Sequence, residues 1–174
     1  EIIEGDILTW DVPPIDVIVA NLPYSISSPI LFRLFSYKWT RAILMFQEEF
    51  ANRLVAKPGS KVYGRLSVMA NHYVGTKKLF KVSKTAFQPQ PKIHSQVVKL
   101  VRREPDYDLD DFDTFERVVR SIFTHRRKKI RNCIKLSFPD IDVKELKYMD
   151  LRAEILQPSE IAELSNSIFA LNSE

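Results

Sequence analysis

A short apolar run that ends in a polar, proline-containing tetrapeptide is the feature that most constrains the fold. Residues Ile15–Ala20 have the sequence Ile-Asp-Val-Ile-Val-Ala, which is typical of a buried strand. Asn21-Leu22-Pro23-Tyr24 follows directly. Because the tetrapeptide places an amide, a fixed turn and an aromatic face at a strand end, the sequence predicts a candidate site after this strand.

The tetrapeptide carries groups that suit the exocyclic amine of a flat base. The Asn21 side chain and the Leu22 backbone carbonyl can each accept a hydrogen bond from such an amine. Pro23 fixes its own φ at about −65° and biases Leu22 away from helical geometry. Tyr24 offers a ring on which a base taken out of its stack can lie. The alternative is an ordinary turn, in which Asn and Pro are common.

The first 105 residues are expected to alternate between strands and helices. Strands are predicted at Glu1–Ile3, Arg41–Phe46, Lys77–Val82 and Gln96–Arg102, the last two as an antiparallel pair. Helices are predicted over Gln47–Ala56 and Leu66–Tyr73. This order indicates an α/β sheet.

From Asp111 onward the pattern is helical. One apolar stripe has helical spacing and consists of Phe112, Phe115, Val118, Val119, Ile122 and Phe123. Asp106–Asp113 is an acidic linker whose last carboxylates favour a helix N-terminus. Two or more closing helices are expected, one around Leu146–Leu151 and one after Pro158. The sequence therefore predicts two domains, residues 1–105 and residues 106–174.

Charge is distributed in blocks along the chain. Residues 61–103 hold 10 Lys and Arg and no Asp or Glu, and residues 117–135 hold 8 and none. The stretch between them, residues 104–116, holds 7 acidic residues and no basic ones. Two blocks free of acidic residues are what a phosphate-binding surface requires, although charged runs are often only solvated faces. We interpret the pattern as favouring a nucleic-acid partner.

Composition limits the other classes of function. Cys133 is the only cysteine, so an intrachain disulfide and multi-cysteine metal sites are excluded, and no metal is expected. The longest apolar runs are shorter than the roughly 20 residues of a membrane span. A cytoplasmic protein with no membrane partner is expected.

Five ordered segments together resemble a known family, the ribosomal RNA adenine dimethyltransferases that use S-adenosylmethionine. The segments are Gly5–Leu8, Asn21–Tyr24, Gln47–Val68, Phe87–Ser95 and Phe123–Asn132. They are similar to the small-subunit dimethyladenosine transferases of the archaeal or eukaryotic type. The resemblance implies the C-terminal part of a Rossmann-like methyltransferase sheet, followed by a small helical RNA-binding domain.

The resemblance also implies roles for particular residues. Asn21, Leu22, Pro23 and Tyr24 would form the catalytic site, and Phe87 would hold the target adenine opposite Tyr24; without the motif, Phe87 would be interpreted as a core residue. Asp6, Ile7 and Asn21 would bind the cofactor. Asp6 could instead merely cap a turn, but its position ahead of Asn21–Tyr24 favours contact with the cofactor.

The candidate RNA-binding residues are cations. The strongest group lies at an expected helix start, where several cations can follow phosphates without identifying bases. The full set is Arg65, Lys92, Arg126, Arg127, Lys128, Lys129 and Arg131.

The expected activity is dimethylation of the exocyclic amine of adjacent adenosines in small-subunit ribosomal RNA during ribosome biogenesis. The expected partner is that RNA within an assembly intermediate, bound by a monomer. Two alternatives stay open: a non-catalytic RNA-binding assembly or transcription factor of the same fold, and a large-subunit adenine methylase.

One departure from the family generates a prediction. The family binds its cofactor mainly through a Gly-rich loop, and no Gly-x-Gly-x-x-Gly motif occurs here, where the chain has 4 glycines. The chain is therefore expected to be part of a longer polypeptide, and its 174 residues alone to bind S-adenosylmethionine weakly. Calorimetric titration of the chain tests this expectation, which micromolar binding would contradict.

Overall fold

The computed structural model describes residues 2–172. The chain divides into two compact units, one of Glu1–Val55 with Tyr73–Glu104 and one of Ala56–His72 with Pro105–Glu174. The division expected at residue 105 coincides with one of these boundaries. Residues 56–72, which were expected in the first domain, instead pack with the second unit.

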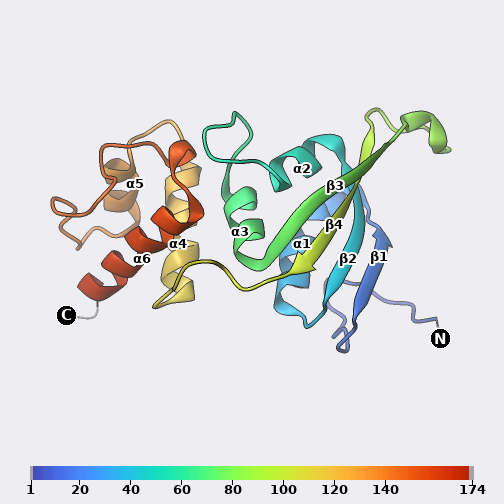
Figure 1. Ribbon diagram of the computed structural model, residues 1–174, viewed down its shortest axis with the longest axis horizontal. Helices are drawn as coiled ribbons and strands as arrows, with labels where there is room; N and C mark the ends of the chain where they lie inside the picture. Colours follow the sequence, from blue (N-terminus) through green and yellow to red (C-terminus); the bar gives the residue numbers. More distant parts are fainter. Residues whose placement is uncertain (1, 173–174) are drawn as a thin grey trace. The chain divides into compact units, whose positions relative to one another are not determined.

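The first unit is built on a four-stranded mixed sheet with the strand order β1-β2-β4-β3 (Figure 1). β1 (Val17–Asn21) pairs in parallel with β2 (Arg41–Gln47). β4 (Ser95–Arg102) is antiparallel to both β2 and β3 (Val74–Val82). The predicted α/β class is confirmed, and the expected pairing of the last two strands is observed.

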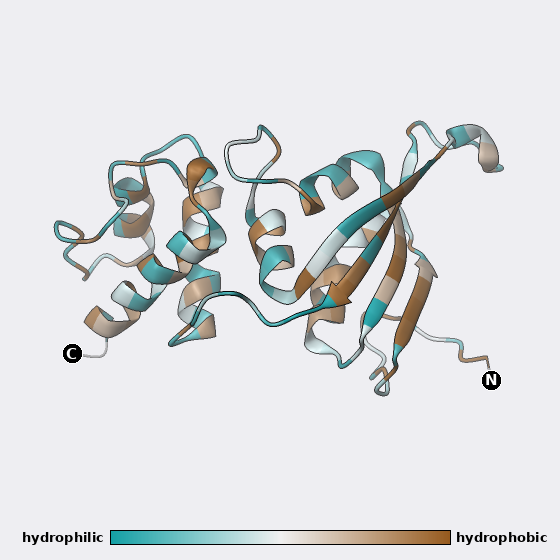
Figure 2. Cartoon of the chain, in the orientation of Figure 1, coloured by the Kyte–Doolittle hydropathy of each residue, from teal (hydrophilic) through white to brown (hydrophobic). Residues whose placement is uncertain are grey.

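One face of this sheet forms the core of the unit. Ala42, Leu44 and Phe46 of β2 alternate with more exposed residues, and they lie beside the equally buried Val98 and Leu100 of β4. Helices α1 (Ser27–Ser36) and α2 (Glu48–Leu54) lie on the same side of the sheet (Figure 1). The hydropathy colouring of Figure 2 shows the apolar strands that these helices flank.

Helix α1 was not predicted, although its sequence contains a signal. Pro29 stands in the first turn, where its missing N–H costs little. Ile30, Leu31 and Leu34 then follow at helical spacing and are buried. This pattern is short, which is why it is easily interpreted as part of a loop.

Arg102 fastens the end of α1 to the end of β4. Its guanidinium donates hydrogen bonds to the carbonyls of Phe35 and Tyr37, the latter at 2.7 Å. It also lies over the rings of Trp39 and Tyr73, 5.0 Å and 5.4 Å from their centroids. Burial lowers the pKa of Arg102, while these carbonyls and rings favour its charge.

Two expectations about strands in the first unit were wrong. Ile15–Ala20 was predicted to be buried, but β1 begins at Val17 and is an edge strand, with Val19 76% exposed. The reason is that the described residues pair with β1 on one side only. Residues 2 and 3 form no strand, and Ile2 is 99% exposed; Glu1, the first residue of that prediction, lies outside the described residues.

The second unit is helical. Its principal helices are α3 (Arg65–Tyr73), α4 (Phe112–Thr124), α5 (Ile130–Ser137) and α6 (Pro158–Asn172). The predicted stripe of α4 supplies core residues, and Asp111 caps the helix by accepting a hydrogen bond from the Thr114 N–H at 2.6 Å. Among the described helices, none is both long enough and apolar enough to cross a membrane.

The prediction of a closing helix around Leu146–Leu151 was wrong. These residues form turns, and Tyr148 has a φ of 68°, in the left-handed region. A residue in that region interrupts a right-handed helix. Met149 of this segment is buried although it lies in a loop, while Leu151 is 39% exposed.

Tyr63 generates a stability prediction for the second unit. Its ring is 1% exposed, and its hydroxyl donates a 3.0 Å hydrogen bond to the Leu156 carbonyl. Tyr63→Phe leaves that carbonyl without a donor and should lower the free energy of unfolding by about 1 kcal/mol. Urea denaturation measures the change.

The matched control is Tyr37→Phe in the first unit. The Tyr37 hydroxyl donates to the Trp10 carbonyl at 2.9 Å in an exposed setting, where water replaces the lost donor. A loss at Tyr37 as large as the loss at Tyr63 would contradict the assignment of the effect to burial.

Candidate functional site

The candidate site begins where β1 ends. Asn21 is the last residue of the strand, Leu22 is buried, and Pro23 has φ −59° and ψ 128°. The extended geometry of Pro23 redirects the chain into a short 3-10 helix, η1 (Tyr24–Ile26), closed by a 3.2 Å bond from Ile26 N–H to the Pro23 carbonyl. The strand end and the proline therefore fix the direction in which Tyr24 leaves the backbone.

A hydrogen bond to the centre of the sheet holds the ring of Tyr24. Its hydroxyl lies 2.5 Å from the hydroxyl of Ser95, and either group can be the donor. Ser95 is the first residue of β4, is fully buried, and pairs with Gln47 of β2 and Val82 of β3. The ring is thus attached to the central strand β4 as well as to the turn. Ser95 belongs to the segment Phe87–Ser95, but no role was predicted for it.

Phe87 comes from the connection between β3 and β4. It follows a short 3-10 helix, η2 (Lys84–Ala86), and its side chain is half-buried. The Gln88–Pro89 peptide bond after it is cis. The His94 carbonyl near the end of the connection accepts a 3.0 Å hydrogen bond from the Glu48 N–H of α2. Helix α2, distant in the sequence, therefore holds the His94 end of this connection.

The tetrapeptide Asn21–Tyr24 and the connection that carries Phe87 line one cavity of about 320 Å³. Its lining consists of Asn21, Leu22, Pro23, Tyr24, Phe87, Pro89 and Pro91. All of the residues predicted to be catalytic are brought together here, and Pro89 and Pro91 of the connection join its wall.

The lining combines a few polar groups with flat apolar surfaces. An amide side chain and backbone carbonyls provide acceptors, while aromatic rings and prolines provide surfaces for a planar ring. Within residues 2–172 no cluster of His, Cys, Asp or Glu side chains is placed to hold a metal ion. The arrangement suits a heteroaromatic base that carries an amine.

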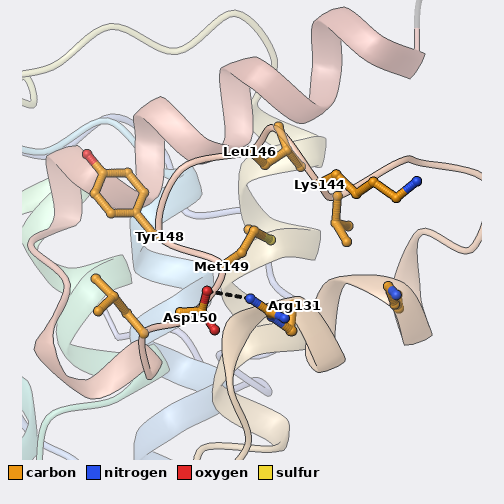
Figure 3. A pocket seen from close by; sticks show the side chains of 9 residues that line it. Arg131, Lys144, Leu146, Tyr148, Met149 and Asp150 are labelled. Atoms are coloured by element: carbon orange, nitrogen blue, oxygen red, sulfur yellow. Dashed lines mark hydrogen bonds and ion pairs between the residues drawn. The ribbon is translucent and has the colours of Figure 1, made fainter.

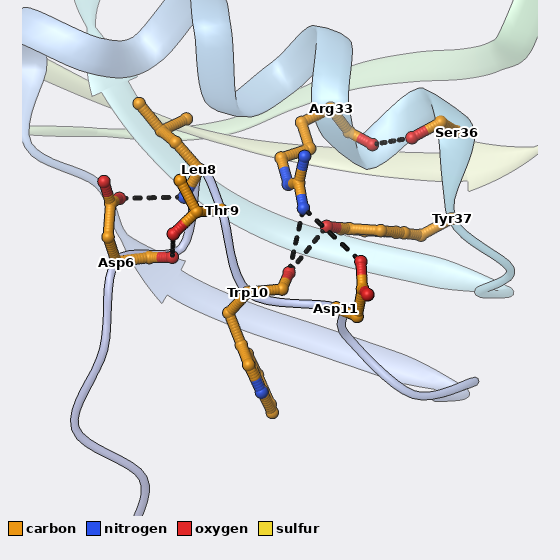
Figure 4. Close-up of polar contacts among 8 residues, drawn as sticks. All are labelled: Asp6, Leu8, Thr9, Trp10, Asp11, Arg33, Ser36 and Tyr37. Atoms are coloured by element: carbon orange, nitrogen blue, oxygen red, sulfur yellow. Dashed lines mark hydrogen bonds and ion pairs between the residues drawn. The ribbon is translucent and has the colours of Figure 1, made fainter.

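Asp6 and Ile7 do not join the described residues that line this cavity. The Asp6 carboxylate accepts a 2.9 Å hydrogen bond from the Leu8 N–H (Figure 4). The Asp6 backbone carbonyl accepts from the Trp10 N–H at 2.9 Å. The Trp10 carbonyl in turn accepts from Arg33 of α1 at 3.0 Å. Asp6 therefore caps a turn that is anchored to α1, and its contact with a cofactor stays a prediction.

Comparison with known proteins decides the family. The profile of the family described as "Ribosomal RNA adenine dimethylase" matches residues 1–171. The chain belongs to the ribosomal RNA adenine dimethylase family. The family recognised from the motifs is thereby confirmed.

Two relatives agree with this membership. Proteins of Methanococcoides burtonii and Methanosarcina acetivorans, each named a probable ribosomal RNA small subunit methyltransferase A, are 44% and 45% identical to the chain. The matches cover 99% of the chain and 67% and 68% of those proteins.

A crystal structure of a dimethyladenosine transferase from Plasmodium falciparum superimposes with a TM-score of 0.80 at 27% identity, over 94% of this chain and 70% of that one. The 23S rRNA methyltransferase ErmE shares the fold, with a TM-score of 0.70 at 24% identity, over 99% of this chain and 72% of that one.

Within this member of the dimethylase family, several predicted RNA-binding cations are engaged in ion pairs. Arg65 pairs with Glu116 at 2.8 Å, and Lys129 and Arg131 both pair with Asp150. These hydrogen bonds and charges lower the pKa of Asp150, with Lys129 as the largest cause. Three of the predicted cations therefore help to hold the helical unit together.

Among the predicted cations, Arg126 is held by contacts with two backbone carbonyls and one carboxylate. Its guanidinium donates to the Lys61 carbonyl at 2.7 Å and the Ser60 carbonyl at 3.2 Å, and it pairs with Glu154 at 3.1 Å. It thus links the loop before α3 to the segment before α6, which are far apart in the sequence.

Arg127, Lys128 and Lys92 differ from the paired cations. Their side chains are exposed, and none of them pairs with an acidic residue among residues 2–172. Arg127 and Lys128 lie on the turn between α4 and α5, because α5 begins only at Ile130. The predicted cluster is therefore mostly a turn rather than a helix start.

The contact between Tyr24 and Ser95 generates a prediction. Tyr24→Phe and Ser95→Ala should each lower the free energy of unfolding by about 1 kcal/mol, because each removes the same hydrogen bond. The double variant should lose little more than either single variant. Urea denaturation of the four proteins measures this coupling, and additive losses would show that the two hydroxyls do not interact.

Proposed function

We propose that this protein transfers methyl groups from S-adenosylmethionine to the exocyclic amine of adenosines in small-subunit ribosomal RNA. The observation that carries the proposal is the cavity in which Asn21–Tyr24 and Phe87 converge. Family membership supports the reaction class, and the names of the relatives from the two methanogens support the small subunit as the substrate.

Asn21 and Leu22 would orient the amine. The nitrogen of an adenine amine is a poor nucleophile because its lone pair is delocalised into the ring. Acceptors on the two N–H groups, the Asn21 side-chain oxygen and the Leu22 carbonyl, favour the pyramidal nitrogen that attacks. Holding that nitrogen in line with the methyl group would lower the entropic part of the barrier.

Tyr24 and Phe87 would hold the base itself. An adenosine must leave its helix to enter the cavity, which costs a few kcal/mol. Stacking on an aromatic side chain returns about 1–3 kcal/mol per base. Because Ser95 fixes the Tyr24 ring before any base arrives, little further ordering would be needed on binding.

Residues for the cofactor are present only in part. Asn21 lines the cavity, whereas Asp6 and Ile7 lie in the turn anchored to α1. One Asp6 oxygen already accepts from Leu8, and the other could accept from the adenine amine of the cofactor. The bound cofactor would supply a methyl group activated by a positively charged sulfur, so this chain would need neither a metal nor a strong general base.

The proposal extends to partners and setting. We place the substrate in a small-subunit assembly intermediate, bound by a monomer in the cytoplasm. Arg127, Lys128 and Lys92 would contact RNA phosphates, since they are the exposed predicted cations without an acidic partner among the described residues.

The test is transfer of labelled methyl groups to small ribosomal subunits that lack the modification. The full-length natural protein is used, and the product nucleoside is identified by mass spectrometry. Dimethyladenosine in small-subunit RNA supports the proposal. RNA binding without transfer would favour a binding factor, and transfer confined to large subunits would favour the other methylase class.

Tyr24→Ala gives the sharpest prediction for the cavity. The rate of methyl transfer should fall at least tenfold, roughly, because one stacking contact is removed. RNA affinity, measured by filter binding, should be unchanged because the exposed cations are intact. Undiminished transfer would exclude a role of Tyr24 in holding the base.

The exposed cations Arg127 and Lys128 generate a prediction about RNA binding. Replacing Arg127 and Lys128 by Gln should weaken RNA binding and reduce the slope of log affinity against log salt by about 0.7–0.9 per contact. The free energy of unfolding should stay nearly constant. Arg126→Gln is the matched control, and it should instead lower stability because Arg126 binds Lys61, Ser60 and Glu154.

A further inference from the structure

A second cavity, which no part of the proposed reaction uses, lies within the helical unit. It has a volume of about 460 Å³, within the range of about 300–1,000 Å³ typical of ligand sites. Its lining is formed by α5 and by the loop that follows it, and Figure 3 shows the side chains around it. We call it the α5 pocket, and its lining residues are Arg131, Lys135, Val143, Lys144, Leu146, Tyr148, Met149, Asp150 and Leu151.

Backbone hydrogen bonds hold the wall of this pocket in place. The Ile130 N–H donates to the Leu151 carbonyl at 2.9 Å, and the Arg131 N–H donates to the Met149 carbonyl at 3.0 Å. These bonds satisfy the first amides of α5, which otherwise have no partner within the helix. The loop is therefore docked on the helix start, and the pocket is formed by defined backbone contacts.

Tyr148 adds a further constraint to the wall. Its φ of 68° is rare for a residue with a side chain, and such geometry persists only where the surroundings hold it. Its hydroxyl donates to the Glu163 carboxylate of α6 at 2.5 Å. That hydrogen bond to a carboxylate raises the pKa of Tyr148 to about 12.

The charges around the α5 pocket are predominantly positive. Arg131 and the neighbouring Lys129 share the single lining carboxylate, Asp150. Figure 3 shows the pair that Asp150 forms with Arg131. Lys144 has only a loose, exposed pair with Asp142 at 3.7 Å, which contributes little. Lys135 is exposed and has no ion pair within the described part of the chain. An anionic group would therefore be favoured at the rim.

The rest of the lining is apolar. Val143 and Met149 are each 6% exposed, while Leu146, Leu151 and the Tyr148 ring are more accessible. A small inorganic anion would leave this apolar surface unused. A ligand that joins a flat ring to a phosphate would use both the apolar lining and the cations.

We infer that the α5 pocket binds one unpaired nucleotide of RNA, with its base against Leu146, Tyr148 and Leu151 and its phosphate at Lys135 and Lys144. The choice of RNA as the partner rests on the proposed function. A base inside a helix is stacked and cannot enter a concave pocket, so the nucleotide must come from a loop, a bulge or an end. The pocket would thus recognise single-stranded RNA at a surface that does no chemistry.

The three methionines of the chain provide a direct test. Met149 lines the α5 pocket, Met45 pairs with Asn21 in the sheet, and Met69 is buried in α3. Methionine methyl groups labelled with ¹³C therefore report separately on the pocket, on the strand beside the candidate active site, and on a reference position. The probe is a short single-stranded oligouridylate, titrated into the 174-residue chain and followed by NMR.

We expect the Met149 signal to shift and saturate while the Met69 signal stays constant. Lys135→Glu should weaken this binding about tenfold, because a charge-assisted contact is lost and a repulsive charge is added. Lys57→Glu is the matched control: Lys57 is exposed in the same unit, has no ion pair among the described residues and does not line the pocket. It should change the affinity by less than about twofold.

Three outcomes would overturn the inference. A shift of Met45 without Met149 would place single-stranded RNA elsewhere. Equal weakening by both charge reversals would indicate general attraction rather than a site. Tighter binding of a polyglutamate peptide than of oligouridylate, followed at Met149, would identify a pocket for a protein partner. None of these readings requires methyl transfer, so failure of the proposed reaction would be distinguishable from failure of this inference.

Discussion

The register of β4 against β2 is the constraint on which the first unit depends. It places Ser95 opposite Gln47 at one end of the pair, under the Tyr24 hydroxyl. At the other end it places Arg102 where the guanidinium reaches the last carbonyls of α1. A slip of one residue would turn every β4 side chain to the opposite face and remove both contacts, together with the buried Val98 and Leu100.

The candidate active site follows from that register. A cavity built from one strand end and one loop would be poorly defined if its rings were free to move. Here the ring of Tyr24 is attached to the sheet, and the connection that carries Phe87 is held to α2 through the His94 carbonyl. The site therefore combines uncharged acceptors with preset aromatic surfaces, which suits chemistry on a neutral base.

Charge in the sequence and charge available to a partner are different quantities. The basic block 117–135 was interpreted as part of a phosphate-binding surface, but Arg126, Lys129 and Arg131 pair with Glu154 and Asp150. Each acidic residue follows its basic partner by about 20–30 positions in the sequence. No local count of charge can detect such pairing, because only the fold brings the partners together.

The sequence by itself determined the α/β class, the antiparallel pair of the last two strands, the apolar stripe of α4 and the residues that converge in the cavity. The strands and the helix stripe follow from local periodicity, and the cavity residues follow from sequence motifs that include Asn21–Tyr24. Tertiary structure alone decided that residues 56–72 pack with the helical unit, that β1 lies at an edge, that the segment containing Tyr148 is a loop, and which cations stay unpaired. Those outcomes depend on contacts between residues distant in the chain, and such contacts leave no periodic signal in the sequence.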